Sequence, residues 1–305
     1  MTKHFISIAD YSREEIEEIF EITEDLKEKT YHYKEHHLCR GLTMAMIFAK
    51  PSARTRISFE TGMYQLGGYA LYLSPNDIGI GQREAVRDIS RVISRYNDII
   101  MARLFNHQHI LELAEFASVP VINGLTDYNH PCQIMADMFT ILEHRGSIDN
   151  LKVTYIGDGN NVANSWINLA SVLPFNLVIC SPSDYEPDKA TLANAQTKNV
   201  GAVELIPDPV EAVTGADIVY TDVWASMGQE SESQKRAEAF KGYQVNQDLI
   251  SHAKAEVKVM HCLPAHRGDE ITGDVLDSPQ SIVFDEAENR MHVQKAIIVK
   301  LLGKA

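Results

Sequence analysis

Short apolar segments alternate with helical patterns along the chain, and this alternation constrains the fold more than any other feature of the sequence. The apolar run at residues 42–48 ends at a turn, which is typical of a strand buried on both faces of a sheet. The later segments of the first half are predicted as strands at 69–73, 98–104 and 119–122, and as helices at 59–66, 84–96 and 110–116. Strands and helices in this order predict a parallel sheet with helices on both faces.

The same pattern begins again after residues 145–151, so we predict two doubly wound α/β domains joined by helices. The strands of the second half are predicted at 152–156, 177–180, 203–206, 218–221 and 257–261. A chain of 305 residues is long enough for two such domains. We expect them at 1–145 and 146–287, connected by a helix at 134–144, with a C-terminal helix at 288–305 packing back on the first domain.

The charge and the cysteines of the chain exclude several classes of protein. A formal net charge of −14 argues against a nucleic-acid-binding protein, because such a protein needs a basic face. None of the four cysteines forms a C-x-x-C pair, and the chain has no N-x-[ST] sequon, apolar signal core or bilayer-spanning apolar run. We therefore expect a cytoplasmic protein with reduced thiols and no membrane attachment.

A basic and hydroxyl-rich segment, Ser52-Ala53-Arg54-Thr55-Arg56, follows the predicted strand at 42–48 and opens a helix. Ligands of a doubly wound sheet bind at the carboxyl ends of its strands, and a helix start offers N–H groups and a partial positive charge. The hydroxyls of Ser52 and Thr55 and the guanidinium of Arg54 would complete a phosphate cradle. The alternative is a solvated basic helix start, which the position directly after an apolar strand disfavours.

Two better-known phosphate motifs are not matched. The chain has no G-x-x-x-x-G-K-[ST] segment, which argues against a P-loop ATPase. Residues 157–162 begin like the dinucleotide motif G-x-G-x-x-G, but Val162 replaces the third glycine. A nicotinamide oxidoreductase is disfavoured for the same reason.

Further polar residues follow other predicted strands. Arg103 ends the strand at 98–104, and His130 and Gln133 come after the strand at 119–122, where they could polarise a carbonyl and hold an amine. In the second half, Asp222 is placed to bind an ammonium group, and Cys262 could lie beside a reacting amine. The structural alternatives are a His-Pro loop–helix junction, an inert buried cysteine, and neighbouring histidines that serve packing rather than zinc binding.

The motifs FAKPSARTRISFE, MAR, HPCQ, GDGNN, DVWASMGQ, HCLP and DEAENR together resemble the ornithine carbamoyltransferases. The likeness runs in order through nearly the whole chain, so the set is more specific than any one motif. It implies transfer of the carbamoyl group from carbamoyl phosphate to the δ-amine of L-ornithine, in arginine biosynthesis or urea-cycle type chemistry. It also implies a homotrimer with shared active sites and no metal or organic cofactor.

The resemblance also implies roles for particular residues. The residues implied to bind carbamoyl phosphate are Ser52, Ala53, Arg54, Thr55, Arg103, His130 and Gln133. The residues implied to bind ornithine are Asn161, Asp222, Ser226, Met227, Cys262 and Leu263. The residues implied to act in catalysis are Arg103, His130, Cys262 and Arg290.

Two positions depart from the family pattern. Ala53 stands where the family's phosphate motif has a threonine, so we expect a weaker grip on phosphate with function retained. The glycine-rich loop at 74–84 corresponds to a family loop that covers the phosphate of a neighbouring subunit, and Gln82 is the residue we assign to that contact on a loose match.

The alternatives are a carbamoyltransferase with another acceptor and a non-catalytic binding protein. Aspartate as the acceptor would call for additional basic residues, and putrescine would leave Asp222 without an α-ammonium partner. A non-catalytic binding protein on the same fold would be expected to lack Arg54, Arg103, His130 or Cys262, and all four are present.

Overall fold

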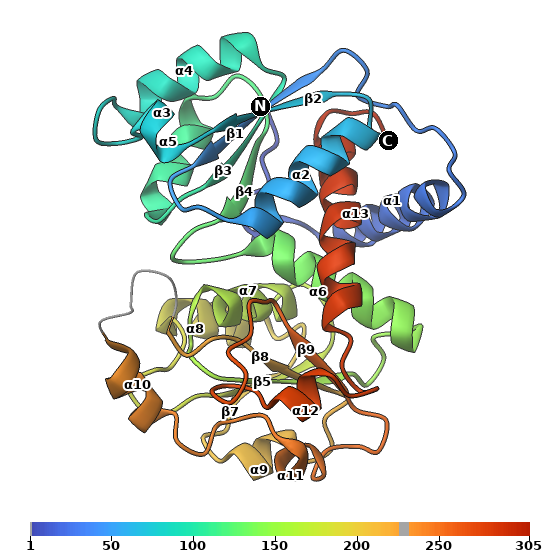
Figure 1. The fold of residues 1–305 in the computed structure, drawn as a ribbon, viewed down its shortest axis with the longest axis vertical. Helices are drawn as coiled ribbons and strands as arrows, with labels where there is room; N and C mark the ends of the chain where they lie inside the picture. Colours follow the sequence, from blue (N-terminus) through green and yellow to red (C-terminus); the bar gives the residue numbers. More distant parts are fainter. Residues whose placement is uncertain (1, 226–231) are drawn as a thin grey trace. The chain divides into compact units, whose positions relative to one another are not determined.

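Two parallel sheets with flanking helices form the framework of the chain, which confirms the predicted α/β fold (Figure 1). The structure, a computed structural model, describes residues 2–225 and 232–305. One unit is formed by residues 1–139 and 289–305, and a second by residues 140–288. The boundaries between the units lie inside two helices, α6 (Pro131–Arg145) and α13 (Val283–Leu301).

The first unit contains a four-stranded sheet in the order β2-β1-β3-β4, in which all neighbouring strands are parallel. Its strands are β1 (Thr43–Phe48), β2 (Tyr69–Leu73), β3 (Ile99–Arg103) and β4 (Val121–Leu125). Its other helices are the 3-10 turn η1 (Ile8–Asp10), α1 (Arg13–Tyr31), α2 (Ala53–Gln65), α3 (Pro75–Ile78), α4 (Val86–Tyr96) and α5 (His107–Phe116).

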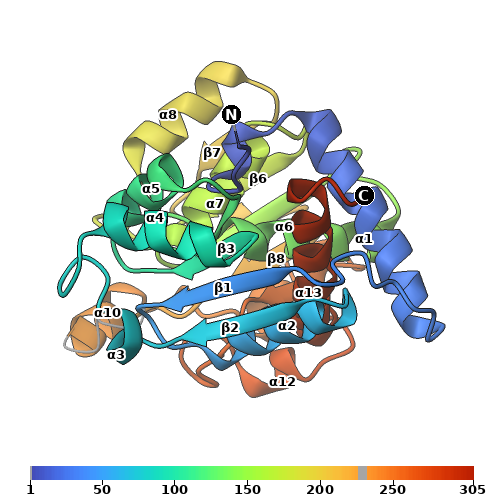
Figure 2. The same cartoon turned by 90° about the horizontal axis from the view of Figure 1, so that it is seen from above.

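Alternating side chains of the first sheet serve its two faces. Ala45 and Ile47 of β1 belong to an apolar cluster with Ile89 and Ile93 of α4. Figures 1 and 2 show α4 and α5 on this side of the sheet, and α2 and α13 on the other side. A Cβ atom on Gly62 of α2 would lie 3.1 Å from a side-chain carbon of α13, so a glycine permits the close approach of these two helices.

The second unit contains a five-stranded parallel sheet in the order β7-β6-β5-β8-β9. Its strands are β5 (Lys152–Ile156), β6 (Asn176–Cys180), β7 (Val203–Leu205), β8 (Ile218–Thr221) and β9 (Lys258–His261). Its helices are α7 (Asn161–Ala170), α8 (Lys189–Lys198), α9 (Pro209–Val213), α10 (Ser233–Ala239), α11 (Gln247–Ile250) and α12 (Gly273–Leu276).

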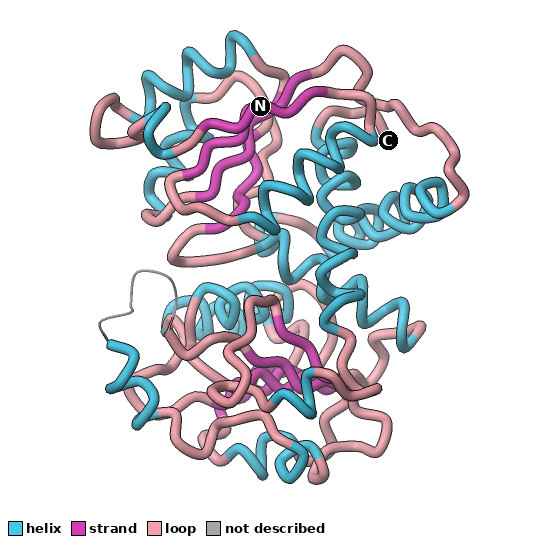
Figure 3. Tube along the Cα trace, viewed as in Figure 1, coloured by secondary structure: helices cyan, strands magenta, loops and turns pink. Residues whose placement is uncertain are grey.

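The core of the second unit is divided by its sheet. Val219 and Val259 pack with residues of α9, α11 and α12 on one face. On the other face, the Trp166 ring of α7 meets the Tyr220 ring at 5.5 Å, edge to face. Figure 3 shows helices on both sides of these strands. None of the helices in the described part of the chain is both long and apolar enough to cross a membrane.

Candidate active site

Thr55 lies at the centre of a polar cluster in the first unit. It is fully buried in the first turn of α2, where its backbone N–H donates to the hydroxyl of the N-cap residue Ser52 at 3.3 Å. The hydroxyl oxygen of Thr55 accepts from Arg103 Nη1 at 3.3 Å and from Arg290 Nη2 at 2.9 Å. One hydroxyl therefore joins the start of α2, the carboxyl end of β3 and the helix α13.

The electrostatic field of this cluster is positive. Arg103 and Arg290 are 8% and 4% exposed, so water screens their charges little. The pKa of His130 lies well below its ordinary value, first because the ring is buried and then because Arg290, Arg103 and Lys50 repel a proton. The His130 ring is therefore neutral near pH 7, while the surrounding cations favour an anionic ligand.

The two arginines of the phosphate segment have different environments. Arg56 pairs with Glu60 at 3.1 Å, and its guanidinium carbon lies 4.0 Å from the centre of the Tyr72 ring. Arg54 is exposed and has no hydrogen-bond or ion-pair partner among the described residues. Arg54 is thus the one of these two arginines that remains available to an incoming anion, as proposed from the sequence.

Three further residues were predicted to bind the phosphate-bearing substrate. Gln133 is buried in α6, one turn from His130, and its Nε2 donates to Asp137 at 2.8 Å. Ala53 is the first residue of α2 and is exposed, so it contributes only its backbone N–H. Gln82 is exposed in the turn between α3 and α4, and no contact joins it to the Thr55 cluster within the described chain.

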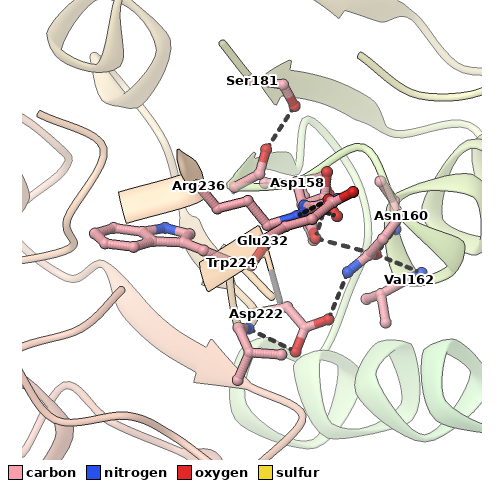
Figure 4. Close-up of polar contacts among 12 residues, drawn as sticks. Asp158, Asn160, Val162, Ser181, Asp222, Trp224, Glu232 and Arg236 are labelled. Carbon is pink, nitrogen blue, oxygen red and sulfur yellow. Dashed lines mark hydrogen bonds and ion pairs between the residues drawn. The ribbon is translucent and has the colours of Figure 1, made fainter. Parts of the chain in front are cut away.

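Asp222 is the centre of a second cluster, at the carboxyl end of β8 in the second unit. Its side chain is buried and accepts from Asn160 Nδ2 at 2.8 Å, from the Val223 N–H at 2.8 Å and from Cys262 Sγ at 3.0 Å. Figure 4 shows the side chain of Asn160 reaching one carboxylate oxygen of Asp222, and the Val223 N–H bonds to the other. A carboxylate fixed by several donors has a defined orientation and is suited to an ammonium group.

Asn160 is not among the site residues predicted from the sequence. Its side-chain oxygen caps α7 by accepting from the backbone N–H groups of Val162 and Ala163, and its side-chain nitrogen donates to Asp222. Its neighbour Asn161, which we predicted to bind ornithine, is the first residue of α7 and is half-buried. The preference of asparagine for the N-cap position was a signal that favoured Asn160. Ser226 and Met227 lie outside the described residues.

The loop after β9 presents Cys262 and Leu263. The N–H of Leu263 donates to His261 Nδ1 at 2.9 Å, and His261 Nε2 lies 3.0 Å from Glu270 Oε1 in a fully buried pair. Since Nδ1 is the acceptor, Nε2 carries the proton that is donated to Glu270. These contacts fix the backbone that carries Cys262.

Three side chains at the ends of β8 and β9 have the composition of a metal site. The ligand atoms of Asp222, His261 and Cys262 lie within 4.8 Å of one another. Both ring nitrogens of His261 are already engaged, by Leu263 and by Glu270, so the ring has no lone pair to offer in this arrangement. The hydrogen-bonding role of these side chains is therefore favoured over metal binding.

The two clusters suit different chemical groups. The cationic cluster at Thr55 can hold a phosphate and stabilise negative charge that develops on a neighbouring oxygen. The cluster at Asp222 can hold an ammonium group, with the thiol of Cys262 beside it. The first cluster thus suits an anionic compound, and the second suits an amino compound.

Comparison with protein families agrees with this division. Residues 3–143 match the family model described as the carbamoyl-P binding domain of aspartate/ornithine carbamoyltransferase. Residues 149–301 match the model described as the Asp/Orn binding domain of the same family. The two matches together span nearly the whole chain.

Individual relatives are similar over the same length. The chain is 54% identical to a chloroplastic ornithine carbamoyltransferase of Pisum sativum, over 99% of this chain and 81% of the relative. It is 52% identical to an ornithine carbamoyltransferase of Thermococcus kodakarensis, over 98% and 96%. The structure resembles ornithine carbamoyltransferase from Pyrococcus furiosus with a TM-score of 0.95 at 48% identity, covering 99% of this chain and 97% of the other.

Proposed function

The chain belongs to the aspartate/ornithine carbamoyltransferase family, and on this premise we propose that it transfers the carbamoyl group of carbamoyl phosphate to the δ-amine of L-ornithine. The products are L-citrulline and phosphate. One observation carries this proposal: Thr55 and Arg103 of the cationic cluster lie in the segment similar to carbamoyl-P binding domains, and the acidic cluster lies in the segment similar to Asp/Orn binding domains, which also supplies Arg290 to Thr55. Relatives at about half identity are named ornithine carbamoyltransferases.

The reaction on the donor side follows from the charges at Thr55. The neutral δ-amine attacks the carbonyl carbon, and negative charge builds on the carbonyl oxygen. Arg103, His130 and Thr55 form a preorganised donor set for that oxygen, with Arg290 holding the Thr55 hydroxyl. The bond from carbon to the phosphate oxygen then breaks, and Arg54 with the N–H groups at the start of α2 binds the leaving phosphate.

The acceptor side is served by Asp222 and its partners. The carboxylate of Asp222 pairs with the α-ammonium of ornithine, and Cys262 with Leu263 lies beside the reacting amine. Asn161, Ser226 and Met227 are proposed to complete the ornithine site. The reacting amine loses a proton, and the departing phosphate can accept it, so no covalent enzyme intermediate and no metal or organic cofactor is needed.

Ornithine is favoured over aspartate because of the groups near Asp222. A second carboxylate on the acceptor would require a cation that is not already committed. Arg236, which is labelled with Asp222 in Figure 4, is committed to Asp158 at 2.9 Å and to the Trp224 carbonyl at 2.8 Å. The names of two similar proteins, from Pyrococcus furiosus and Campylobacter jejuni, include the word anabolic, and we propose the arginine-biosynthetic direction here as well.

We propose a homotrimer in which neighbouring chains share active sites. Support comes from apolar side chains exposed on α2 and on the edge strand β2: Ile57 and Tyr69 are 61% and 66% exposed. Single chains rarely leave such side chains in water beside an edge strand unless another chain covers them. The exposed Gln82 would then reach the phosphate in the adjacent chain. A cytoplasmic location is supported by four cysteines that form no disulfide.

An acceptor screen tests the proposed activity. Purified protein is incubated with carbamoyl phosphate and with ornithine, aspartate or putrescine, and the ureido product and phosphate are measured. We expect citrulline and phosphate in equal amounts from ornithine. Faster turnover of aspartate or putrescine would overturn the proposed acceptor, and no product from any amine would overturn the transferase assignment.

A further inference from the structure

The guanidinium of Arg236 joins three loops of the second unit. Arg236 lies in α10, yet its Nη1 lies 2.9 Å from Asp158 Oδ2 and donates to the Trp224 carbonyl at 2.8 Å. Its guanidinium carbon lies 5.0 Å from the centre of the Tyr185 ring. The three partners belong to the loops at the carboxyl ends of β5, β6 and β8. Figure 4 shows the Arg236 side chain extending to Asp158 beside Trp224 and Glu232.

Two of these loops carry the Asp222 cluster. Asp158 lies two residues before Asn160, whose side chain holds Asp222 Oδ2 at 2.8 Å. Trp224 lies two residues after Asp222. Arg236 therefore crosslinks the same two loops that Asn160 and Asp222 crosslink, and the two connections are separated by only two residues on each loop. A change in one connection must alter the geometry of the other.

The charges make Arg236 necessary for this arrangement. Asp158 and Arg236 are each 7% exposed, and a buried carboxylate is costly unless a cation lies beside it. Burial raises the pKa of Asp158, Arg236 acts to lower it and the charges of Asp222 and Glu232 act to raise it, and the pKa is about 6 as a result. Loss of the guanidinium would leave two neighbouring acids to repel each other across the acceptor cluster.

We propose that Arg236 is a positioning residue for the amino-acid acceptor, because it holds the loops after β5 and β8 at the separation that orients Asp222. Arg236 does not itself touch the reacting atoms. The inference rests on the proposed function only for the identity of the acceptor. It predicts that Arg236 affects acceptor binding and leaves the phosphate-binding cluster of the first unit unaffected.

The first test separates the two substrates kinetically. Arg236→Ala should raise the acceptor KM by about tenfold or more, the scale of lost charge-assisted hydrogen bonds, with the carbamoyl phosphate KM changed less than about twofold. Arg236→Lys should recover part of the loss, because it keeps the charge beside Asp158 but cannot also reach the Trp224 carbonyl in the planar geometry of a guanidinium. Equal increases in both KM values would overturn the proposal.

Arg145→Ala is the matched control. Arg145 also joins an acid and backbone carbonyls, since its Nε lies 3.8 Å from Asp217 and its other nitrogens donate to the carbonyls of residues 147 and 149. Asp217 precedes β8, at the opposite end of the strand from Asp222. Arg145→Ala should leave the acceptor KM within about twofold of the wild-type value. A change as large as that of Arg236→Ala would show a general effect of removing an arginine.

Chemical rescue provides the second test. Arg236 lines a pocket of about 320 Å³ together with Asp158, Tyr185 and Glu232, so a small cation can reach the space that Arg236→Ala leaves. Millimolar guanidinium should lower the acceptor KM of Arg236→Ala several-fold, while sodium chloride at the same ionic strength should not. Absence of rescue in a variant that melts cooperatively at the wild-type temperature would contradict the positioning role.

Failure of the positioning role of Arg236 can be distinguished from failure of the proposed acceptor. The ratio of variant to wild-type KM is measured with whichever amine the wild-type enzyme accepts. If that amine is not ornithine, the proposed acceptor fails and the role of Arg236 is still decided by the ratio. If ornithine is accepted and the ratio is the same for both substrates, only the inference about Arg236 fails.

Discussion

At the scale of single residues, Arg54 offers a direct test of the phosphate cradle. Arg54→Ala should leave the free energy of unfolding within about 0.5 kcal/mol of wild type, because the side chain is exposed and has no partner among the described residues. It should nevertheless raise the carbamoyl phosphate KM and lower turnover, since a charge-assisted contact is lost. Steady-state kinetics and urea unfolding measure the two effects.

Two further variants test whether the effect is specific to the guanidinium of Arg54. Arg54→Lys should recover little activity, because an ammonium cannot reproduce the planar fork of a guanidinium. Arg56→Ala is the control, since Arg56 is already paired with Glu60 and stacked on Tyr72. Near-normal activity in Arg54→Lys would count against a bidentate contact between Arg54 and phosphate.

The raised pKa of Asp158 predicts how the free energy of unfolding changes with pH. Its pKa is about 6 in the folded chain and 3.8 as the ordinary value, so the folded state binds the proton more tightly. The stability that Asp158 contributes is therefore full below pH 4 and decreases as the pH rises toward 6, by roughly 3 kcal/mol. Asp158→Asn cannot titrate. Urea unfolding should show wild type losing stability relative to Asp158→Asn between pH 4 and pH 6.5, and a constant difference would contradict the shifted pKa.

At the scale of elements, Gly159 shows why the loop after β5 contains glycine. A Cβ atom at this position would lie 2.2 Å from the backbone nitrogen of Pro187 and 2.3 Å from the carbonyl carbon of Glu186. Neither atom is the end of a flexible side chain, so the loop itself must move. We expect Gly159→Ala to raise the acceptor KM and to lower the melting temperature by several degrees.

Gly273→Ala is the matched control for that variant. The nearest atom to its added Cβ is Arg267 Nη1 at 3.3 Å, the end of an exposed side chain that can shift. Its kinetics should be close to wild type. The two glycine variants together distinguish backbone contact from a general glycine effect, and an unperturbed acceptor KM in Gly159→Ala would refute the packing argument.

The elements that depend on local pattern could be predicted from the sequence. Strands β2, β5 and β8 begin and end at the predicted residues, since each is a short apolar run next to polar turns. Helix α2 begins at Ala53, inside the segment 52–56 that was predicted to open a helix, although polar residues form its first turns and the apolar helical pattern was placed only at 59–66. Strand β4 continues to Leu125 beyond the predicted 119–122, since Asn123 and Gly124 interrupt the apolar pattern.

Contacts between distant segments could not be predicted in the same way. The sequence indicated Arg103, Thr55 and Arg290 separately, but the shared hydroxyl of Thr55 depends on packing between α2 and α13. The pairing of Arg236 with Asp158 joins residues far apart in the sequence, and no local pattern marks either as a partner. Asn160 belongs to the GDGNN motif, and its contact with Asp222 gives it a role in the site that the motif alone does not assign.

At the scale of the whole molecule, sharing of sites between chains can be tested by mixing. One chain carries Arg103→Ala, and another carries Gln82→Ala with further substitutions in residues 79–84, so that each is inactive alone. Dissociated and reassembled together, the two should form some sites with neither lesion and regain activity. Sedimentation should show trimers in every sample. Mixed trimers without activity would contradict shared sites.

The contact between Arg290 and Thr55 has a consequence for the order in which the enzyme matures during translation. The guanidinium that binds the hydroxyl of Thr55 comes from Arg290, which is synthesised 235 residues later. A nascent chain that contains β1 to β4 and the first turn of α2 still lacks that cation. The donor-binding cluster therefore stays incomplete until α13 has left the ribosome and packed against α2, long after Thr55 itself has been made.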